Sequence, residues 1–292
     1  MTQAFTFIRQ VFLTLALLFS MLLMPAGGEP FAAKDPENAR LVFNAVSDTH
    51  VETNNPDSYA NFKAVLCGMK ANADADAHIF VGDNTMNGQL LENTLFFAPV
   101  GSILSGKTTF VTIGNHDTGN GEGDYDALLK RYMNKHNLYL KNKIDEPYYC
   151  RVVEDCYLIF LSGHDTDLGV LVDDAQYTWL TGVLNEAAES GNPIFVFSHH
   201  PIGYLHDEAG HSVAELLWGY DDVFCINGHT HWSYMTYESG GLPAVNLPRV
   251  TETVDYEAGV GVVAEVYEDE VLFREYNFIT GEVLSETAFA IG

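Results

Sequence analysis

Five short polar segments of this sequence carry side chains that bind metal ions in proteins, and each follows an apolar run that reads as a buried strand. They are Asp48-x-His50, Gly82-Asp83-Asn84, Gly114-Asn115-His116-Asp117, His199-His200 and Gly228-His229-x-His231. Open α/β sheets bind ligands at the carboxyl ends of their strands, so we expect these segments to meet in one crevice. Their imidazole, carboxylate and amide groups, with no thiolate, suit a borderline divalent cation.

The pooled groups are too many for one tetrahedral ion and enough for two ions that share a ligand. Two ions about 3.5–4 Å apart serve in-line displacement at phosphorus, because they stabilise the attacking and leaving oxygens together. Taken alone, each segment is as readily a polar turn, and a lone His199 is more often a hydrogen-bonded core histidine. The repetition of the pattern at five strand ends favours a metal site.

The elements that must position these segments alternate between strands and helices and then become strands only. Strands are predicted at 41–46, 78–81, 109–113, 148–153, 156–161, 194–197 and 223–226, and helices at 59–72, 89–104, 125–135, 175–190 and 212–218. Five more strands are predicted at 233–237, 244–247, 260–267, 271–278 and 283–289. Ser58 is expected to cap the first helix. This order predicts one mixed α/β domain with two facing sheets.

The glycines of three segments have an expected structural role. Gly82, Gly114 and Gly228 are predicted to allow tight turns and a close approach of the backbone at the strand ends.

The five motifs and their order resemble the calcineurin-like metallophosphoesterase superfamily, which includes purple acid phosphatases, cyclic-nucleotide phosphodiesterases and nucleotidases. The resemblance covers most of residues 41–231. It implies an α/β fold, a four-layer α/β/β/α sandwich with two facing mixed β-sheets, and a dinuclear metal site at the carboxyl ends of the strands.

The resemblance also assigns residues to the two metal ions. It implies that Asp48, His50 and His231 bind the first, that Asp83 bridges both, and that Asn115, His199 and His229 hold the second. The ligand types fit Mn, Fe, Zn or a mixture. Purple acid phosphatases place a tyrosine ligand where this chain has Met86, so a tyrosinate–iron site is not expected.

Two further residues are assigned to catalysis by the resemblance. His116 would face the substrate and protonate the leaving oxygen or stabilise charge on the phosphoryl group, with Asp117 behind it to fix its tautomer and orientation. Two ligand carboxylates leave two divalent ions with about two uncompensated positive charges, which suits a phosphate dianion. A hydroxide bridging the metals would be the nucleophile, because its pKa would be lowered.

The charge balance limits the class of partner. The 292 residues include 14 Lys and Arg against 40 Asp and Glu, a net charge of −26. Nucleic-acid backbones and anionic membrane surfaces need a basic footprint, so neither is expected as a partner. A small phosphoester remains compatible if metal ions supply positive charge. The sequence does not distinguish monoesters from diesters, and the oligomeric state stays open.

The first segment predicts export. Arg9 precedes an apolar run at 11–24, and small residues follow at 26–28, which is typical of a secretory signal peptide over 1–28. An uncleaved anchor is the alternative, but the run is shorter than the roughly 20 residues that a span needs. The catalytic domain is predicted at 39–292 in a periplasmic, cell-surface or secreted protein, with no membrane span after cleavage. Export would permit a disulfide between Cys150 and Cys156 across a predicted hairpin.

Two other functions compete with hydrolysis of phosphoesters. The same fold could serve as a non-catalytic metal-binding surface module, and the ligands could belong to a metallohydrolase that acts on carbon centres. Specificity is expected in rim loops at 49–58, 119–124 and 204–210, and His164 could line the pocket.

Overall fold

The computed structural model describes residues 32–166, 169–251 and 258–292. The predicted signal peptide lies outside the described residues, so export and the limits of the catalytic domain stay predictions. No helix among the described residues is long and apolar enough to cross a membrane.

The first sheet contains three parallel strands that carry the first three motifs. Its order is β15-β14-β13-β1-β2-β3, with β1 (Leu41–Val46), β2 (Ala77–Val81), β3 (Thr108–Thr112), β13 (Val260–Val266), β14 (Glu270–Asn277) and β15 (Glu282–Ala290). Strands β1, β2 and β3 run parallel, and β13 pairs antiparallel with β1. The last residues of β1, β2 and β3 therefore lie at one edge of the sheet.

The second sheet carries the two histidine motifs in the same way. Its order is β11-β12-β10-β8-β5-β4, with β4 (Tyr149–Val153), β5 (Cys156–Leu161), β8 (Ile194–Ser198), β10 (Val223–Asn227), β11 (Met235–Ser239) and β12 (Leu242–Asn246). Strands β5, β8, β10 and β12 run parallel, and the two edge strands are antiparallel. Both sheets are mixed, as predicted.

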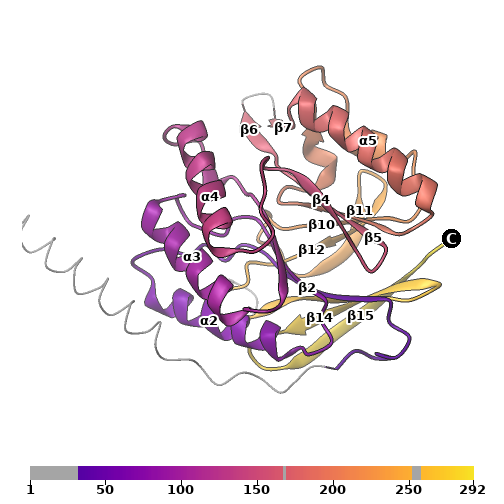
Figure 1. Cartoon of the computed structure of the whole chain (residues 1–292), viewed down its shortest axis with the longest axis horizontal. Coiled ribbons are helices and arrows are strands. Elements are labelled where there is room, and N and C mark those ends of the chain that lie inside the picture. Colours follow the sequence, from indigo (N-terminus) through magenta and orange to yellow (C-terminus); the bar gives the residue numbers. More distant parts are fainter. Residues whose placement is uncertain (1–31, 167–168, 252–257) are drawn as a thin grey trace, which may run out of the picture.

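Helices cover the outer face of each sheet. Figure 1 shows α2 (Pro56–Ala71), α3 (Leu90–Ile103) and α4 (Tyr125–Tyr139) together on one side and α5 (Asp174–Ser190) on the other. The short helix α6 (Val213–Leu217) packs on the second sheet with α5. Three hydrophobic cores separate the layers, one under each set of helices and one between the sheets. The predicted four-layer α/β/β/α sandwich is confirmed.

Side chains alternate between the two faces along each strand, so one strand contributes to two hydrophobic cores. In β1, Phe43 faces the second sheet, where its ring lies edge-on to Phe195 and Phe197 with centroids 5.2 and 5.6 Å away. Its neighbours Val42 and Val46 face the helices instead. Successive side chains of a strand point to opposite faces, so an uninterrupted apolar run is what a sheet buried on both faces requires.

A small third sheet was not predicted. It joins β6 (His164–Thr166), β7 (Gly169–Leu171) and β9 (Leu205–His206). These strands are two or three residues long, too short to show the alternation by which a strand is recognised in sequence.

One local prediction is wrong, and a disulfide that the sequence left open does not form. The first helix is capped by Asn55, whose side chain accepts from the backbone nitrogen of Ser58, because Pro56 can begin a helix without donating its missing N–H. Cys150 and Cys156 are free thiols. In the hairpin of β4 and β5, Cys150 pairs with Ile159 and Cys156 with Val153, so the two thiols point to opposite faces.

Candidate metal centre

Four predicted ligands form one compact cluster at the strand ends. Ligand atoms of Asp48, His50, Asp83 and His231 all lie within 4.8 Å of one another. The Nε2 atom of His231 is 3.0 Å from Oδ1 of Asp48, and Nε2 of His50 is 3.5 Å from the same oxygen. Both imidazoles therefore aim Nε2 at one carboxylate oxygen, which is the convergence that a cation needs.

Asp83 lies between this cluster and a second histidine. Its Oδ2 atom is 3.6 Å from Nε2 of His50 and 3.1 Å from Nε2 of His199. The other ring nitrogen of His199, Nδ1, is 2.9 Å from the carbonyl oxygen of Val81. Because Nδ1–H donates to that carbonyl, Nε2 is the ring atom that faces Asp83 and would be available to a metal ion.

Asn115 and His229 are the remaining predicted ligands. The side-chain nitrogen of Asn115 donates to Asn120 over 2.8 Å, which leaves Oδ1 of Asn115 buried without a hydrogen-bond partner. The ring of His229 lies 5.2 Å from that of His199, and its backbone nitrogen donates to Oδ2 of Asp48. A buried oxygen without a partner costs about 1–3 kcal/mol. A cation would satisfy that oxygen, so the donor set fits a bound metal.

The charges of the centre are strongly coupled. Burial alone would raise the pKa of Asp83, but His199 and His50 lower that pKa to about 2. Burial likewise opposes protonation of His199, yet Asp83 and Asp48 raise its pKa to about 10. The two carboxylates therefore create a buried negative potential that attracts a cation.

The backbone at the predicted ligands is strained. Five of them have positive φ angles: Asp48 (54°), His50 (40°), Asp83 (48°), His229 (69°) and His231 (53°). Non-glycine residues in this region cost about 1–3 kcal/mol each and cluster at functional sites. Hydrogen bonds between the strand ends hold two of them, from Asp48 N to Gly82 O and from His50 N to Asp83 O.

The motif glycines allow the close approach that was predicted for them. A Cβ at Gly114 would lie 2.2 Å from Oδ1 of Asp83, and one at Gly228 would lie 2.3 Å from Oδ2 of Asp48. Both distances are far below a van der Waals contact. Any side chain at these positions would displace a predicted ligand carboxylate.

His116 lies at the rim of the cluster. It begins the 3₁₀ turn η1 (His116–Thr118), and its ring is edge-on to that of His50 with centroids 4.7 Å apart. Its Nδ1 atom is 2.8 Å from the carbonyl oxygen of Met86, and its backbone nitrogen donates to Asp83. The carbonyl of Met86 holds the ring, a contact that any residue type at position 86 could make and that the sequence does not signal.

The predicted support of His116 by Asp117 is wrong. The buried carboxylate of Asp117 accepts hydrogen bonds from Gly114, Asn84 and Thr85. Successive residues of a 3₁₀ turn point about 120° apart, so neighbours in η1 cannot share a direction. Asp117 therefore ties the ends of β2 and β3 together.

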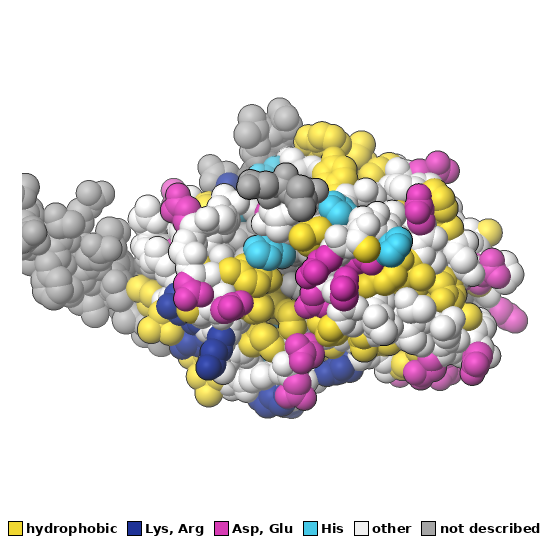
Figure 2. Space-filling view, turned by 90° about the horizontal axis from the view of Figure 1, so that it is seen from above, with side chains coloured by type: hydrophobic (Ala, Val, Ile, Leu, Met, Phe, Trp, Pro, Cys, Tyr) yellow, Lys and Arg dark blue, Asp and Glu magenta, His cyan; other side chains and the backbone are white. Residues whose placement is uncertain are grey.

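Two histidines outside the predicted ligand set border the centre. Nε2 of His200 is 3.1 Å from Oδ1 of Asp165, and its ring lies 4.3 Å from that of His229. His164 stacks on Tyr125 with centroids 4.0 Å apart, and both line a cavity of about 470 Å³ that also reaches Asn115. On this face, exposed histidines lie among acidic and hydrophobic side chains, while Lys and Arg gather mostly toward one edge (Figure 2).

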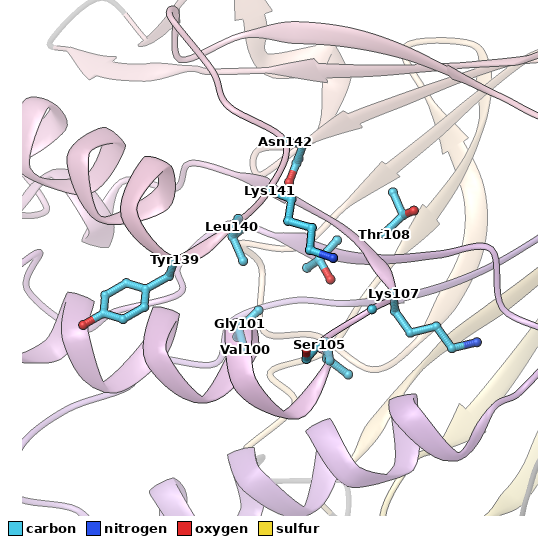
Figure 3. A pocket seen from close by; sticks show the side chains of 12 residues that line it. Val100, Gly101, Ser105, Lys107, Thr108, Tyr139, Leu140, Lys141 and Asn142 are labelled. Atoms are coloured by element: carbon cyan, nitrogen blue, oxygen red, sulfur yellow. The ribbon is translucent and has the colours of Figure 1, made fainter.

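A different cavity, of about 390 Å³, lies at the amino end of β3 (Figure 3). Lys107 and Lys141 line it, and Nζ of Lys107 donates to the carbonyl of Ala73. Among the described side chains that line it, none is a carboxylate or an imidazole. Since β3 separates this cavity from Asn115 by about 17 Å of strand, it is not part of the metal centre.

Comparison with known proteins agrees with this geometry. The profile of the calcineurin-like phosphoesterase family matches residues 41–233, which include the nine predicted ligands and catalytic residues. No curated protein sequence matches the chain at a significant level.

Solved structures share the fold, among them the following three. A dimetal phosphatase from Danio rerio has 15% identity and a TM-score of 0.62, over 87% of this chain and all of the other. A purple acid phosphatase from yellow lupin seeds has 13% identity and a TM-score of 0.60, over 86% of this chain but only 53% of its own. GAP50, the anchor in the inner membrane complex of Plasmodium, has 15% identity and a TM-score of 0.51, over 86% of this chain and 89% of its own.

Proposed function

The chain belongs to the calcineurin-like phosphoesterase family, hydrolases that act on phosphoester bonds, and on that premise we propose that it hydrolyses a small phosphoester at the strand-end cluster. The proposed ligands are the seven residues that the motifs supply: Asp48, His50, Asp83, Asn115, His199, His229 and His231. The position of Asp83 carries the proposal, because its carboxylate lies between His50 and His199 and can serve two ions at once.

Two divalent ions, of Mn, Fe, Zn or a mixture, would supply positive charge to the phosphoryl oxygens and activate a water. Asp48 and Asp83 are buried and have lowered pKa values, so both are ionised at neutral pH. They leave a divalent pair with a net positive charge, which selects an anionic substrate despite the acidic chain.

His116 is proposed to move the proton of the leaving group. Its Nδ1 is engaged by the Met86 carbonyl, so Nε2 is the atom that would hold a proton and donate it to the leaving oxygen. Asp83 accepts from the backbone nitrogen of His116, which ties the position of this imidazole to the proposed bridging ligand.

The test separates metal binding from proton transfer. The purified protein, stripped with chelator and reloaded with Mn²⁺, Zn²⁺ or Fe²⁺, is expected to hydrolyse members of a panel of nucleotides, cyclic nucleotides and sugar phosphates. His116→Ala should keep two ions by metal analysis while the rate falls about 10²–10⁴-fold. Loss of metal in this variant would contradict the role of His116.

A non-catalytic module is the second candidate, and one observation favours considering it. GAP50, which shares the fold, is described as an anchor in a membrane complex. If the protein binds two ions but turns over no phosphoester in the panel, the catalytic proposal fails and the module remains.

We also propose that the protein is exported, on the composition of residues 1–28. Expression of the full chain in a secreting host, followed by sequencing of the mature amino terminus, tests this. Cleavage between residues 26 and 28 is expected, and recovery of the uncleaved chain in the membrane fraction would contradict the proposal.

A further inference from the structure

A cavity of about 310 Å³ lies beside the metal centre and is lined by the segments that follow β8 and β10, by β11 and by the end of β12. Pro201, which lines it, directly follows His200, and Trp232 directly follows His231. On the sheet, Met235 pairs with Asn246, the last residue of β12, which runs parallel to β10. The cavity therefore opens at the same sheet edge as the predicted ligands.

Large side chains border this cavity and remain exposed. Trp232 is 62% exposed, Tyr204 is 53% exposed and Met235 is 39% exposed. Exposed aromatic side chains grouped beside a concave site are typical of ligand binding. Each ring exposes apolar area to water, and a bound ligand would cover that area. Tryptophan and tyrosine rings stack well on planar aromatic groups.

The backbone that carries the Trp232 indole is held in place. The backbone nitrogen of Trp232 donates to Oγ1 of Thr230 over 3.2 Å, and Oγ1 of Thr230 donates to Oδ1 of Asn246 over 2.7 Å. The side-chain nitrogen of Asn246 donates in turn to the carbonyl of Ser233. A ring presented by a fixed backbone loses little conformational entropy when a ligand stacks on it.

Two hydroxyl groups of the cavity wall are already hydrogen-bonded. Oη of Tyr237 donates to Asn227 over 2.6 Å, and Oγ of Ser239 accepts from the backbone nitrogen of Gly203. Met235, Tyr237 and Ser239 share one face of β11, and Glu238, which also lines the cavity, extends from the other face of that strand. No lysine or arginine is among the described residues that line the cavity. Without a basic side chain among the described lining residues, the wall disfavours a second phosphate, and its exposed rings favour a planar group.

We propose that this aromatic cavity binds a planar aromatic group of the substrate, stacked on Trp232 and Tyr204, beside the phosphoryl group at the metal centre. The proposal rests on the proposed phosphoesterase function and narrows its substrate class. The preferred substrates are phosphoesters whose alcohol carries an aromatic ring, such as a nucleobase or an aryl group.

The test uses leaving groups that differ only in planarity. Benzyl and cyclohexylmethyl phosphate have alcohols of similar size and acidity, so the two should react at similar rates without the cavity. The methyl diesters of both phosphates are tested as well, in case the enzyme is a diesterase. The Mn²⁺-loaded wild type should favour the benzyl ester by about tenfold in kcat/KM. Trp232→Ala and Tyr204→Ala should abolish this preference. Trp179→Phe on α5, away from the cavity, is the control and should keep the preference.

A second measurement is independent of turnover. Binding of 1-naphthylmethylphosphonate to the Mn²⁺-loaded protein, followed by ligand fluorescence, should weaken about tenfold in Trp232→Ala and stay unchanged in Trp179→Phe. Hydrolysis of both esters without preference, and without an effect of Trp232→Ala, would overturn the aromatic cavity while leaving the phosphoesterase intact. Hydrolysis of neither ester nor of the phosphoester panel would overturn the proposed function itself.

Discussion

Two pairs of histidines are equally buried in this protein but have opposite electrostatic surroundings. His50 and His199, at the strand ends, face the carboxylates of Asp48 and Asp83. His78 and His136 lie within the fold and face amide groups instead: Nδ1 of His78 is 2.9 Å from the side-chain nitrogen of Asn44, and Nδ1 of His136 is 3.1 Å from Oδ1 of Asn137.

The pKa values reflect a balance between burial and nearby carboxylates, since burial still lowers the pKa of His50 although Asp48 and Asp83 lie beside it. Burial lowers the pKa of His78 to about 3 and that of His136 to about 4, so both are neutral in the folded protein. For His199, the carboxylates outweigh burial and raise the pKa to about 10. A buried histidine therefore indicates a cation site only when buried carboxylates lie beside it, because they attract a metal ion as they attract a proton.

The largest expected effect comes from removing a carboxylate from the first pair. Asp83→Asn keeps the shape of the side chain but removes the charge between His50 and His199. We expect loss of bound metal and a fall in kcat/KM of about a thousandfold, since metal ions supply several kcal/mol of transition-state stabilisation. Metal analysis and phosphoester kinetics measure both.

The matched control is a histidine of the second pair. His78→Gln keeps a side-chain oxygen that can accept from Asn44, and it should leave metal content and rate within about threefold of wild type. Equal losses in Asp83→Asn and His78→Gln would show that burial, and not the carboxylate, decides the behaviour of these histidines.

Much of this site could be predicted because each predicted ligand follows a strand whose apolar run is visible in the sequence. Parallel strands end at the same edge, so the recurrence of Asp, His and Asn after β1, β2 and β3 implies their meeting. The boundaries of β1 and β5 match the prediction, since turn residues flank both strands. The positive φ angles at Asp48 and His229 were not predictable, because the surrounding hydrogen bonds impose them against local preference.

The wrong prediction for Asp117 and the absence of a Cys150–Cys156 disulfide share one cause, which is the direction of the side chains. Whether Asp117 faces His116 depends on the pitch of a single turn, and whether Cys150 faces Cys156 depends on strand register. Neither is encoded by residue type. Trp232 gave no signal for the same reason, because its exposure follows from the hydrogen bonds that fix its loop.

An intermediate effect is expected from a third buried carboxylate, which contacts backbone and neutral donors. Burial and the nearby Asp83 raise the pKa of Asp117 to about 6, the opposite of the lowered value for Asp83. Asp117→Asn replaces one acceptor oxygen by an NH₂, which then meets the donor of Gly114 if it replaces Oδ2 or that of Thr85 if it replaces Oδ1. Metal affinity and rate should each fall about 10–100-fold, as for groups that position ligands.

A readout beyond activity separates positioning from proton transfer in this variant. If Asp117 only ties the strand ends together, Asp117→Asn should keep the pH dependence of kcat and the Nδ1–H tautomer of His116, observed by ¹⁵N NMR. A changed tautomer of His116 in the variant would mean that Asp117 supports His116, as the sequence predicted.

The smallest effect is expected at His136, a histidine of the second pair. In the unfolded chain a histidine has a pKa of about 6.5, and in the folded protein that of His136 is about 4. Between these values the unfolded chain binds more protons, so the stabilisation present above pH 6.5 is lost as the pH falls toward 4. Each such histidine contributes a slope of up to about 1.4 kcal/mol per pH unit.

His136→Gln should therefore flatten the acid side of the stability curve. Urea unfolding measures this between pH 6 and 4.5. As the pH falls, the free energy of unfolding should decrease less steeply in the variant than in wild type, by about 1.4 kcal/mol per pH unit. His211→Gln is the control: Asp207 raises the pKa of His211, so its contribution is constant below pH 6.5 and the slope should not change. An unchanged slope in His136→Gln would mean that His136 is protonated in the folded protein, and the contrast between the two pairs would then rest on His78 alone.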